Sequence, residues 1–149
     1  MNKDMIFDAD GQAAQTELKD QRKGAVRYMI KTYVIDTNVL IQAPYALECF
    51  EDNHLVLPLV VLEELDGLKK AEGEKGANAR AAVRKLEEYR HKGDLLQGVE
   101  LPGGGCLRVE KNYVNVELPP DLPDDKPDNR ILKVCKGLAD DKKADQVIL

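Results

Sequence analysis

Short apolar stretches alternate with stretches of helical spacing along most of the chain. The first strong pattern is the apolar, β-branched run at Thr32–Asp36, which predicts a strand buried on both faces. We expect a turn at Thr37–Asn38, a helix at Pro44–Phe50 and a second short strand at Leu55–Leu57. Pro58 suits the first position of the next helix, because proline is tolerated there.

The rest of the chain continues this alternation. The expected elements are, in order, a charged loop at Ala71–Gly76, a helix through Ala79, Val83, Leu86 and Arg90 that Gly93 closes as a left-handed cap, a hairpin-like insertion at Leu101–Leu118, a proline- and acid-rich loop at Pro119–Pro127, a helix that starts at Asp128 and a strand at Gln146–Leu149. Strands that alternate with helices predict an α/β domain with a parallel, doubly wound sheet flanked by helices.

Residues 1–28 differ from the rest because they show no periodic apolar face. They carry five acidic and five basic residues. We therefore expect a polar leader outside the core, followed by one domain over residues 29–149. Neither GxGxxG nor GxxxxGK[ST] is present, so the sequence supports neither a dinucleotide fingerprint nor a P-loop.

Composition narrows the class of protein. Apolar residues make up 43% of the chain and charged residues 33%, which is typical of a soluble globular domain. No apolar run approaches the roughly 18 residues that a membrane span needs. The three cysteines are far apart and form no CxxC pair, so we expect neither a disulfide framework nor a zinc site, and a reducing cytoplasm is the natural location.

The net charge of −5 counts against a domain that grips phosphates with a basic surface. It does not count against a metal-dependent nuclease, in which acids hold cations and the cations meet the phosphate. The question is therefore which acids lie together. Asp36 ends the first strand and Asp128 begins the last helix, so both belong to the sheet edge at the carboxyl ends of the strands, where open α/β sheets bind ligands.

Glu64 is the third candidate, and helical geometry separates it from its neighbour. Val61, Leu65 and Leu68 form the apolar stripe of their helix. At about 100° per residue, Glu64 lies about 60° from Val61 and flanks the buried face, whereas Glu63 lies about 160° away and faces water.

Each acid alone also has an ordinary structural interpretation. Asp128 is a suitable N-cap, Asp36 suits an Asx turn before Thr37–Asn38, and Glu64 resembles any half-exposed surface glutamate. Together they are harder to explain without a cation, because like charges crowded at one edge repel each other. Carboxylate oxygens favour Mg²⁺ or Mn²⁺ over softer metals.

Basic residues follow Glu64 and suggest a rim that positions phosphate beside the acids. These residues are Lys69, Lys70, Lys75 and Arg80. The alternative is a solvated helix face, on which Asp66 pairs with Lys70 at the i,i+4 spacing. Cys135 lies on an apolar stripe and is expected in the core, and the two histidines are assigned no role.

The sequence also resembles a known family. TYVIDTNVL, followed by LVLPLVVLEELDGLKK and then PDNRIL, resembles the PIN domain, and more narrowly the N-terminal PIN domain of PhoH-like proteins. The resemblance covers about residues 30–149. It implies a parallel sheet flanked by helices and a metal-dependent ribonuclease site for single-stranded RNA. Asp36, Glu64 and Asp128 would be the catalytic and metal-binding acids, with Thr37 and Asn38 as supporting neighbours.

The same resemblance implies segments beyond Leu149. Members of the family carry a further aspartate just after the strand that ends here at Leu149, and a PhoH-like ATPase domain follows downstream. We therefore expect a domain without its C-terminal strand, with an open edge that favours self-association. Asp140 and Asp141 close the helix that Asp128 opens, so they do not replace the aspartate.

The function expected from these observations is hydrolysis of single-stranded RNA with Mg²⁺ or Mn²⁺ as cofactor. Two alternatives stay open. One is a PIN-like domain that binds RNA or a protein partner without cutting. The other is a small-molecule phosphohydrolase with an aspartyl nucleophile, which usually needs a second acid two residues on, where this chain has Asn38.

Overall fold

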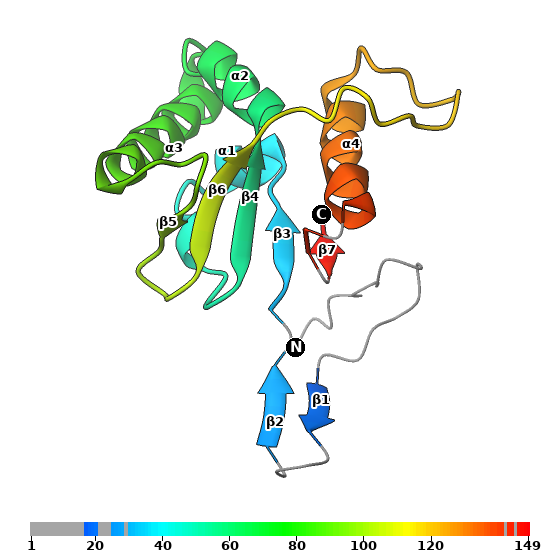
Figure 1. Ribbon diagram of the computed structural model, residues 1–149. Helices are drawn as coiled ribbons and strands as arrows, with labels where there is room; N and C mark the ends of the chain where they lie inside the picture. The colour runs from blue at the N-terminus through cyan, green and yellow to red at the C-terminus, as the bar shows by residue number, and fades with distance from the viewer. Residues whose placement is uncertain (1–16, 21–24, 29, 142, 145) are drawn as a thin grey trace.

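The computed structural model describes residues 17–20, 25–28, 30–141, 143–144 and 146–149. In chain order the elements are β1 (Glu17–Asp20), β2 (Ala25–Tyr28), β3 (Thr32–Val34), α1 (Thr37–Gln42), the 3₁₀ helix η1 (Ala46–Glu48), β4 (His54–Pro58), α2 (Leu59–Leu68), α3 (Gly73–Lys92), β5 (Val99–Glu100), β6 (Cys106–Glu110), α4 (Pro127–Asp140) and β7 (Val147–Ile148) (Figure 1). None of the described helices has the length and apolar character needed to cross a membrane.

A five-stranded sheet forms the centre of the molecule, in the order β5-β6-β4-β3-β7. β3 pairs in parallel with both β4 and β7, and β4 pairs in parallel with β6. Only the short edge strand β5 runs antiparallel to its neighbour β6. The predicted α/β class with a mostly parallel sheet is therefore confirmed.

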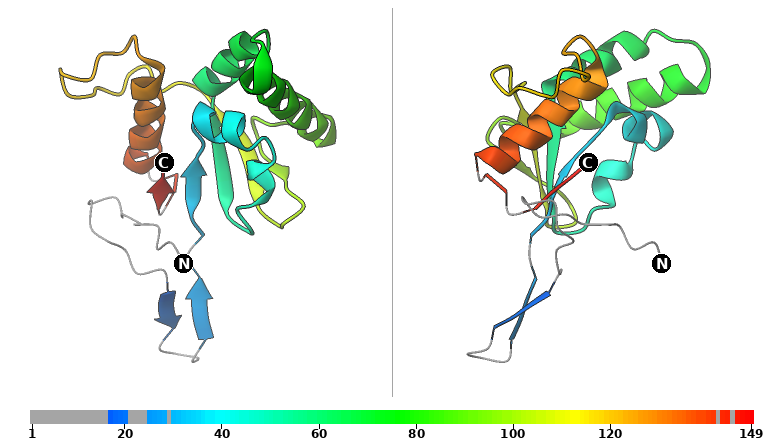
Figure 2. Two further views of the ribbon diagram at one scale, coloured as in Figure 1. Left: turned by 180° about the vertical axis from the view of Figure 1, so that it is seen from behind. Right: turned by 90° about the vertical axis from the view of Figure 1, so that its right-hand side faces the viewer.

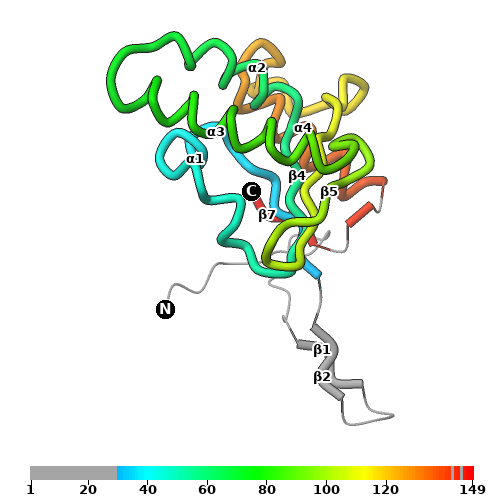
Figure 3. The backbone as a smooth tube through the Cα atoms, turned by 90° about the vertical axis from the view of Figure 1, so that its left-hand side faces the viewer, coloured from blue at the N-terminus to red at the C-terminus, as the bar shows by residue number. Residues whose placement is uncertain are grey.

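Helices cover both faces of this sheet. Figure 2 shows α4 on one face and α1 with η1 on the other. Figure 3 shows α1 beside α3, and these two helices pack closely together. The core between the layers is made of aliphatic side chains with almost no exposed surface, among them Leu40, Leu55, Leu57, Leu65, Leu107, Val134 and Leu138. Every layer of the domain contributes to that list, so the residues form one continuous core.

The segment after β3 differs from the prediction. Thr37–Asn38 is not a turn but the first part of α1, whose N-cap is Asp36. The helix is short, and burial of Leu40 holds it on the core. Pro44 follows the C-cap residue and cannot continue the helix, so the helix predicted over Pro44–Phe50 is reduced to the single turn of η1.

The α2–α3 region contains a second correction. Pro58 ends β4 and caps α2, which begins one residue later than predicted. The loop predicted at Ala71–Gly76 is mostly helical, because α3 already begins at Gly73. A side chain at Gly76 would overlap the backbone carbonyl of Ala71, so glycine is what permits this tight entry. Gly93 follows the last residue of α3 with a φ of 171°, so it is extended and not the predicted left-handed cap.

The region after α3 was only partly anticipated. The expected hairpin-like insertion at Leu101–Leu118 contains one strand of the main sheet, β6, which forms a small hairpin with β5 and pairs in parallel with β4. Residues 111–118 form no strand. Alternation predicts a half-buried strand but not its partner, which explains why β6 was mistaken for part of an insertion.

Two elements near the ends of the chain complete the description. The predicted C-terminal strand is present as β7. β1 and β2 form a separate two-stranded antiparallel sheet, which the sequence did not predict. The remaining positions of the expected leader lie outside the described residues, so its contribution to the core stays a prediction.

Candidate metal and nucleic-acid site

A cavity of about 290 Å³ opens at the carboxyl ends of β3 and β4, beside the N-terminus of α4. Its wall is built from α1, α2, α3 and α4, together with the residue that precedes α1. The lining residues are Asp36, Thr37, Asn38, Ile41, Glu64, Gly67, Leu68, Lys75 and Asp128. All three predicted acids and both predicted neighbours therefore line one cavity.

Asp36 combines a local role with its place in the cavity wall. It follows Ile35, the buried residue just after β3, and its Oδ1 accepts a hydrogen bond of 3.4 Å from the backbone N–H of Asn38. Asp36 therefore does accept the local backbone hydrogen bond that an Asx-type role requires. A contact of 3.4 Å is long for a hydrogen bond, and a carboxylate has about four acceptor positions. Most of the acceptor capacity of Asp36 is therefore free for a ligand.

Glu64 is held by a side chain from another helix. The Thr37 hydroxyl donates a hydrogen bond of 2.8 Å to Glu64 Oε1. Thr37 is only 4% exposed, so the donor is fixed by its surroundings and orients the carboxylate. Glu64 is half-buried and Glu63 is exposed, which agrees with the helical geometry expected from the sequence.

Asp128 reaches the cavity from α4. The helix begins at Pro127 and its N-cap is Lys126, without a side-chain capping bond. The interpretation of Asp128 as the N-cap is therefore wrong, and the carboxylate is not used by the helix end. Its place in the first turn is still favourable, because the N-terminus of a helix carries partial positive charge. Asn129 Nδ2 donates 2.8 Å to the carbonyl oxygen of Pro123, which ties the preceding loop to this turn.

The three acids line one cavity from three separate segments of the chain. Within the part of the chain that the structure describes, no group of three histidine, cysteine, aspartate or glutamate side chains is close enough to hold one ion directly. The donors available in the cavity are carboxylate, hydroxyl and amide oxygens, with no histidine or cysteine. This donor set suits a hard cation such as Mg²⁺, which keeps several of its waters and binds proteins through one or two carboxylates.

The basic residues of the predicted rim have different contacts. Lys75 lines the cavity. Lys69 forms an ion pair of 2.6 Å with Asp66, so Asp66 pairs with Lys69 and not with Lys70 as expected. The hydrogen bond from Lys69 lowers the pKa of Asp66. Arg80 donates to the carbonyl oxygens of Lys69 and Ala71 at 2.8 and 3.3 Å, so it caps the end of α2. Lys70 is exposed and does not line the cavity.

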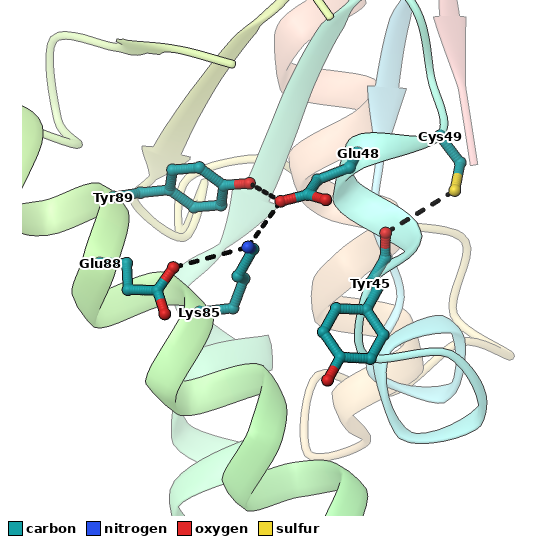
Figure 4. Close-up of polar contacts among 6 residues, drawn as sticks. All are labelled: Tyr45, Glu48, Cys49, Lys85, Glu88 and Tyr89. Carbon is teal, nitrogen blue, oxygen red and sulfur yellow. Dashed lines mark hydrogen bonds and ion pairs between the residues drawn. The ribbon is translucent and has the colours of Figure 1, made fainter. Parts of the chain in front are cut away.

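A polar cluster that no sequence pattern indicated lies outside this cavity. Glu48 Oε1 accepts a hydrogen bond of 2.9 Å from the Tyr89 hydroxyl and an ion pair of 2.7 Å from Lys85 (Figure 4). Burial, followed by the hydrogen bond to Glu48, raises the pKa of Tyr89 to about 12. These contacts fasten η1 to α3. Glu48 and Tyr89 are 41 positions apart, and no local pattern links them.

Cysteine chemistry is not part of this site. All three cysteines are free. Cys135 packs against the core, and burial raises its pKa to about 12. That thiol is therefore protonated at neutral pH and unreactive, as expected for a core residue.

Comparison with known proteins agrees with this fold. Residues 33–149 match the family model of the PIN domain. The chain is 45% identical over 112 residues to protein PhoH2 of Bacillus subtilis, an alignment that covers 74% of this chain and 25% of the relative. It is 39% identical over 117 residues to protein PhoH2 of Mycolicibacterium smegmatis, covering 76% of this chain and 26% of the relative.

A third relative gives the same picture. Protein PhoH2 of Thermobispora bispora is 40% identical over 111 residues, which is 73% of this chain and 25% of the relative. The chain thus spans about a quarter of the length of the curated relatives that it matches. No solved structure matches the chain.

Proposed function

The chain belongs to the PIN domain family, and from this premise we propose that it is a metal-dependent endoribonuclease domain that hydrolyses phosphodiester bonds of single-stranded RNA. One observation carries the proposal. Three carboxylates from separate segments, Asp36, Glu64 and Asp128, line the same cavity at the carboxyl edge of a parallel sheet. Ligands of open α/β sheets bind at this edge.

The charge of the cavity supports a cation there. Its wall carries three carboxylates and one ammonium group, that of Lys75. The three negative charges repel one another, and a bound cation would offset that repulsion. The oxygen-only donor set favours Mg²⁺ or Mn²⁺.

Each residue has a distinct task in this proposal. Asp36, Glu64 and Asp128 would hold the cation directly or through water, and a bound cation would supply an activated water and neutralise charge at the phosphate. Thr37 holds Glu64 in the orientation that faces the cavity. Lys75 would bind a non-bridging oxygen of the phosphate, because a lysine ammonium suits phosphate as a compact point charge.

A second candidate is a PIN-like domain that binds RNA or a partner without cutting it. The spacing of the carboxylates favours it, because no three of them meet around one point among the described residues. The relatives are much longer than this chain, and we propose that the domain works joined to a PhoH-like ATPase domain in its parent protein. Self-association of the domain is a further element of this proposal.

The test compares RNA cleavage and metal binding in matched variants. We expect Mn²⁺-dependent cleavage of a single-stranded RNA that stops with chelator and falls at least a hundredfold in Asp36→Asn and Glu64→Gln. Glu63→Gln removes the same charge from the exposed side of α2 and is the control, with activity close to wild type.

Metal binding is followed separately, by the rise in melting temperature that Mn²⁺ produces. Asparagine caps helices as well as aspartate does, so Asp36→Asn should fold normally and lose that rise. RNA binding without cleavage, in a protein whose melting temperature does respond to Mn²⁺, would favour the second candidate. Cleavage that survives in Asp36→Asn would refute the assignment of the site.

A further inference from the structure

Three of the residues that line the carboxylate-containing cavity carry neither charge nor polar side chain. They are Ile41 of α1 and the neighbouring Gly67 and Leu68 of α2. Ile41 and Leu68 are half-buried and pack against the hydrophobic core, so their positions are fixed. The cavity therefore offers both carboxylates and aliphatic surface, and it suits a ligand that has a charged part and a flat apolar part.

Gly67 is the unusual member of this group. It lies near the end of α2 and one turn after Glu64, at a place where glycine costs about 1 kcal/mol relative to alanine. Its backbone does not need glycine, because its φ is not positive. A Cβ added at Gly67 would meet nothing within 4 Å, so no neighbouring residue requires the gap either.

Gly76, in the same region, is a glycine that packing does require. A Cβ there would overlap the carbonyl of Ala71. Gly67 has the opposite environment: an added Cβ would stand in open space, and the residue itself lines the cavity. We therefore infer that glycine at this position serves access to the cavity, since packing does not require it.

We propose that Gly67, Ile41 and Leu68 form a nucleobase subsite, which seats the base of the nucleotide next to the phosphate held at the carboxylates. This inference rests on the proposed function and names the part of the substrate that the site recognises. A volume of about 290 Å³ lies at the low end of the range for small-ligand pockets, so the subsite accepts one base. A base within a duplex is stacked and paired, and only an unpaired base is free to turn into such a pocket.

The chemistry of these residues also sets the selectivity of the subsite. None of the three side chains carries a hydrogen-bond donor or acceptor, and no aromatic ring lines the cavity among the described residues. Contact with the base is then aliphatic and independent of its hydrogen-bonding edge. The subsite should distinguish a base from no base, but it should distinguish weakly between one base and another.

The experiment measures binding separately from cleavage. A fluorescein-labelled hexauridylate is titrated with protein in Ca²⁺ and followed by anisotropy, beside a hexamer of the same backbone without bases. Gly67→Phe should weaken binding of hexauridylate at least tenfold, because the ring fills the space of the base. Glu63→Phe is the control and should stay within about threefold of wild type, because it adds the same ring to the exposed side of α2.

Every outcome bears on the proposal. It requires that wild type binds hexauridylate more tightly than the abasic hexamer and that Gly67→Phe removes most of this difference. Wild-type affinity in Gly67→Phe, an equal loss for both hexamers, or no binding by wild type would each overturn it. A melting curve checks that Gly67→Phe is folded, and Gly67→Leu replaces it if it is not.

Cleavage in Mn²⁺ separates the subsite from the nuclease. Wild-type protein that shows the predicted binding pattern but cuts no RNA would leave the subsite standing and refute the nuclease. Unchanged cleavage by a folded Gly67→Phe variant with wild-type affinity would support the nuclease and refute the subsite.

Discussion

Replacement of Thr37 by valine isolates the contact that holds Glu64 in the cavity. The Thr37 hydroxyl donates 2.8 Å to Glu64 Oε1 and joins α1 to α2 across 27 positions of sequence. Valine has nearly the same shape, and Thr37 is buried, so Thr37→Val removes the hydrogen bond and leaves the packing in place. The carboxylate of Glu64 then loses the donor that orients it.

The size of the effect follows from the kind of bond. Hydrogen bonds to a charged group contribute about 1.5–3 kcal/mol to stability. Glu64 is half-buried beside an open cavity, where water replaces part of the lost interaction. We therefore expect a value at or just below the lower limit of that range, a loss of about 1–1.5 kcal/mol in the free energy of unfolding.

Urea denaturation of four proteins measures the contact itself. Wild type, Thr37→Val, Glu64→Ala and the double variant form a double-mutant cycle, in which we expect a coupling energy of about 1 kcal/mol. Glu63→Ala replaces Glu64→Ala in a control cycle, and its effect should add to that of Thr37→Val because Glu63 is exposed. Thr37→Val should also weaken Mn²⁺ binding, although it removes no charge from the cavity.

Coupling between Thr37 and Glu64 below about 0.3 kcal/mol, the limit within which independent sites add, would refute this reasoning. The hydrogen bond would then contribute nothing to the fold. Unchanged Mn²⁺ affinity in Thr37→Val would refute the idea that Thr37 orients Glu64 for a cation.

Three further predictions concern stability measured by chemical or thermal denaturation. Gly76→Ala should cost at least about 2 kcal/mol because the added methyl overlaps a backbone carbonyl, whereas Gly67→Ala should gain up to about 1 kcal/mol in open space; the same sign for both would contradict the analysis of these glycines. The pKa of Tyr89 is about 12 in the folded protein, against 10.0 for a free tyrosine. The stability that Tyr89 contributes below pH 10 should therefore fall by roughly 2 kcal/mol as the pH rises to 12. A Tyr89→Phe variant that keeps this pH dependence would contradict the assignment to Tyr89. Asp124→Asn should lower the free energy of unfolding by about 1 kcal/mol, because the buried ammonium of Lys133 loses the carboxylate that lies 2.7 Å away. The expected loss is modest because Asp124 is largely exposed, and unchanged stability would show that water replaces the ion pair.

The sequence predicted the positions of the three acids better than it predicted the helices around them. Glu64 was distinguished from Glu63 because a ten-residue helix with a clear apolar stripe fixes which side faces the core. The helix α1 was missed because it has only six residues, with Thr37 and Leu40 buried, and such a segment has no periodicity to detect. The catalytic roles of Asp36, Glu64 and Asp128 remain predictions, since proximity alone does not test them.

Contacts between distant segments were beyond the reach of local patterns. Arg80 belongs to a cluster of bases in the sequence, but it is used to cap the end of α2. Gly67 is an ordinary helix interior glycine until the cavity beside it is known. The parallel pairing partner of β6 is β4, and the register pairs His54 with Cys106. The alternation of side chains along β6 contains no trace of a partner that lies so far away in the sequence.

The pairing of β3 with β7 has a consequence for synthesis of the chain on the ribosome. It joins Thr32 to Val147 and Tyr33 to Ile148, so more than a hundred residues emerge between the two partners. Bringing such distant segments together costs loop-closure entropy before any contact compensates for it, and folds with this kind of pairing assemble slowly. Until β7 emerges, the edge of β3 that pairs with β7 has no hydrogen-bonding partner in a nascent chain. The helix α4, which carries Asp128, is then not yet followed by its strand. The residues that line the cavity extend from Asp36 to Asp128, so a nascent chain cannot assemble the cavity before the first turn of α4 has emerged from the ribosome.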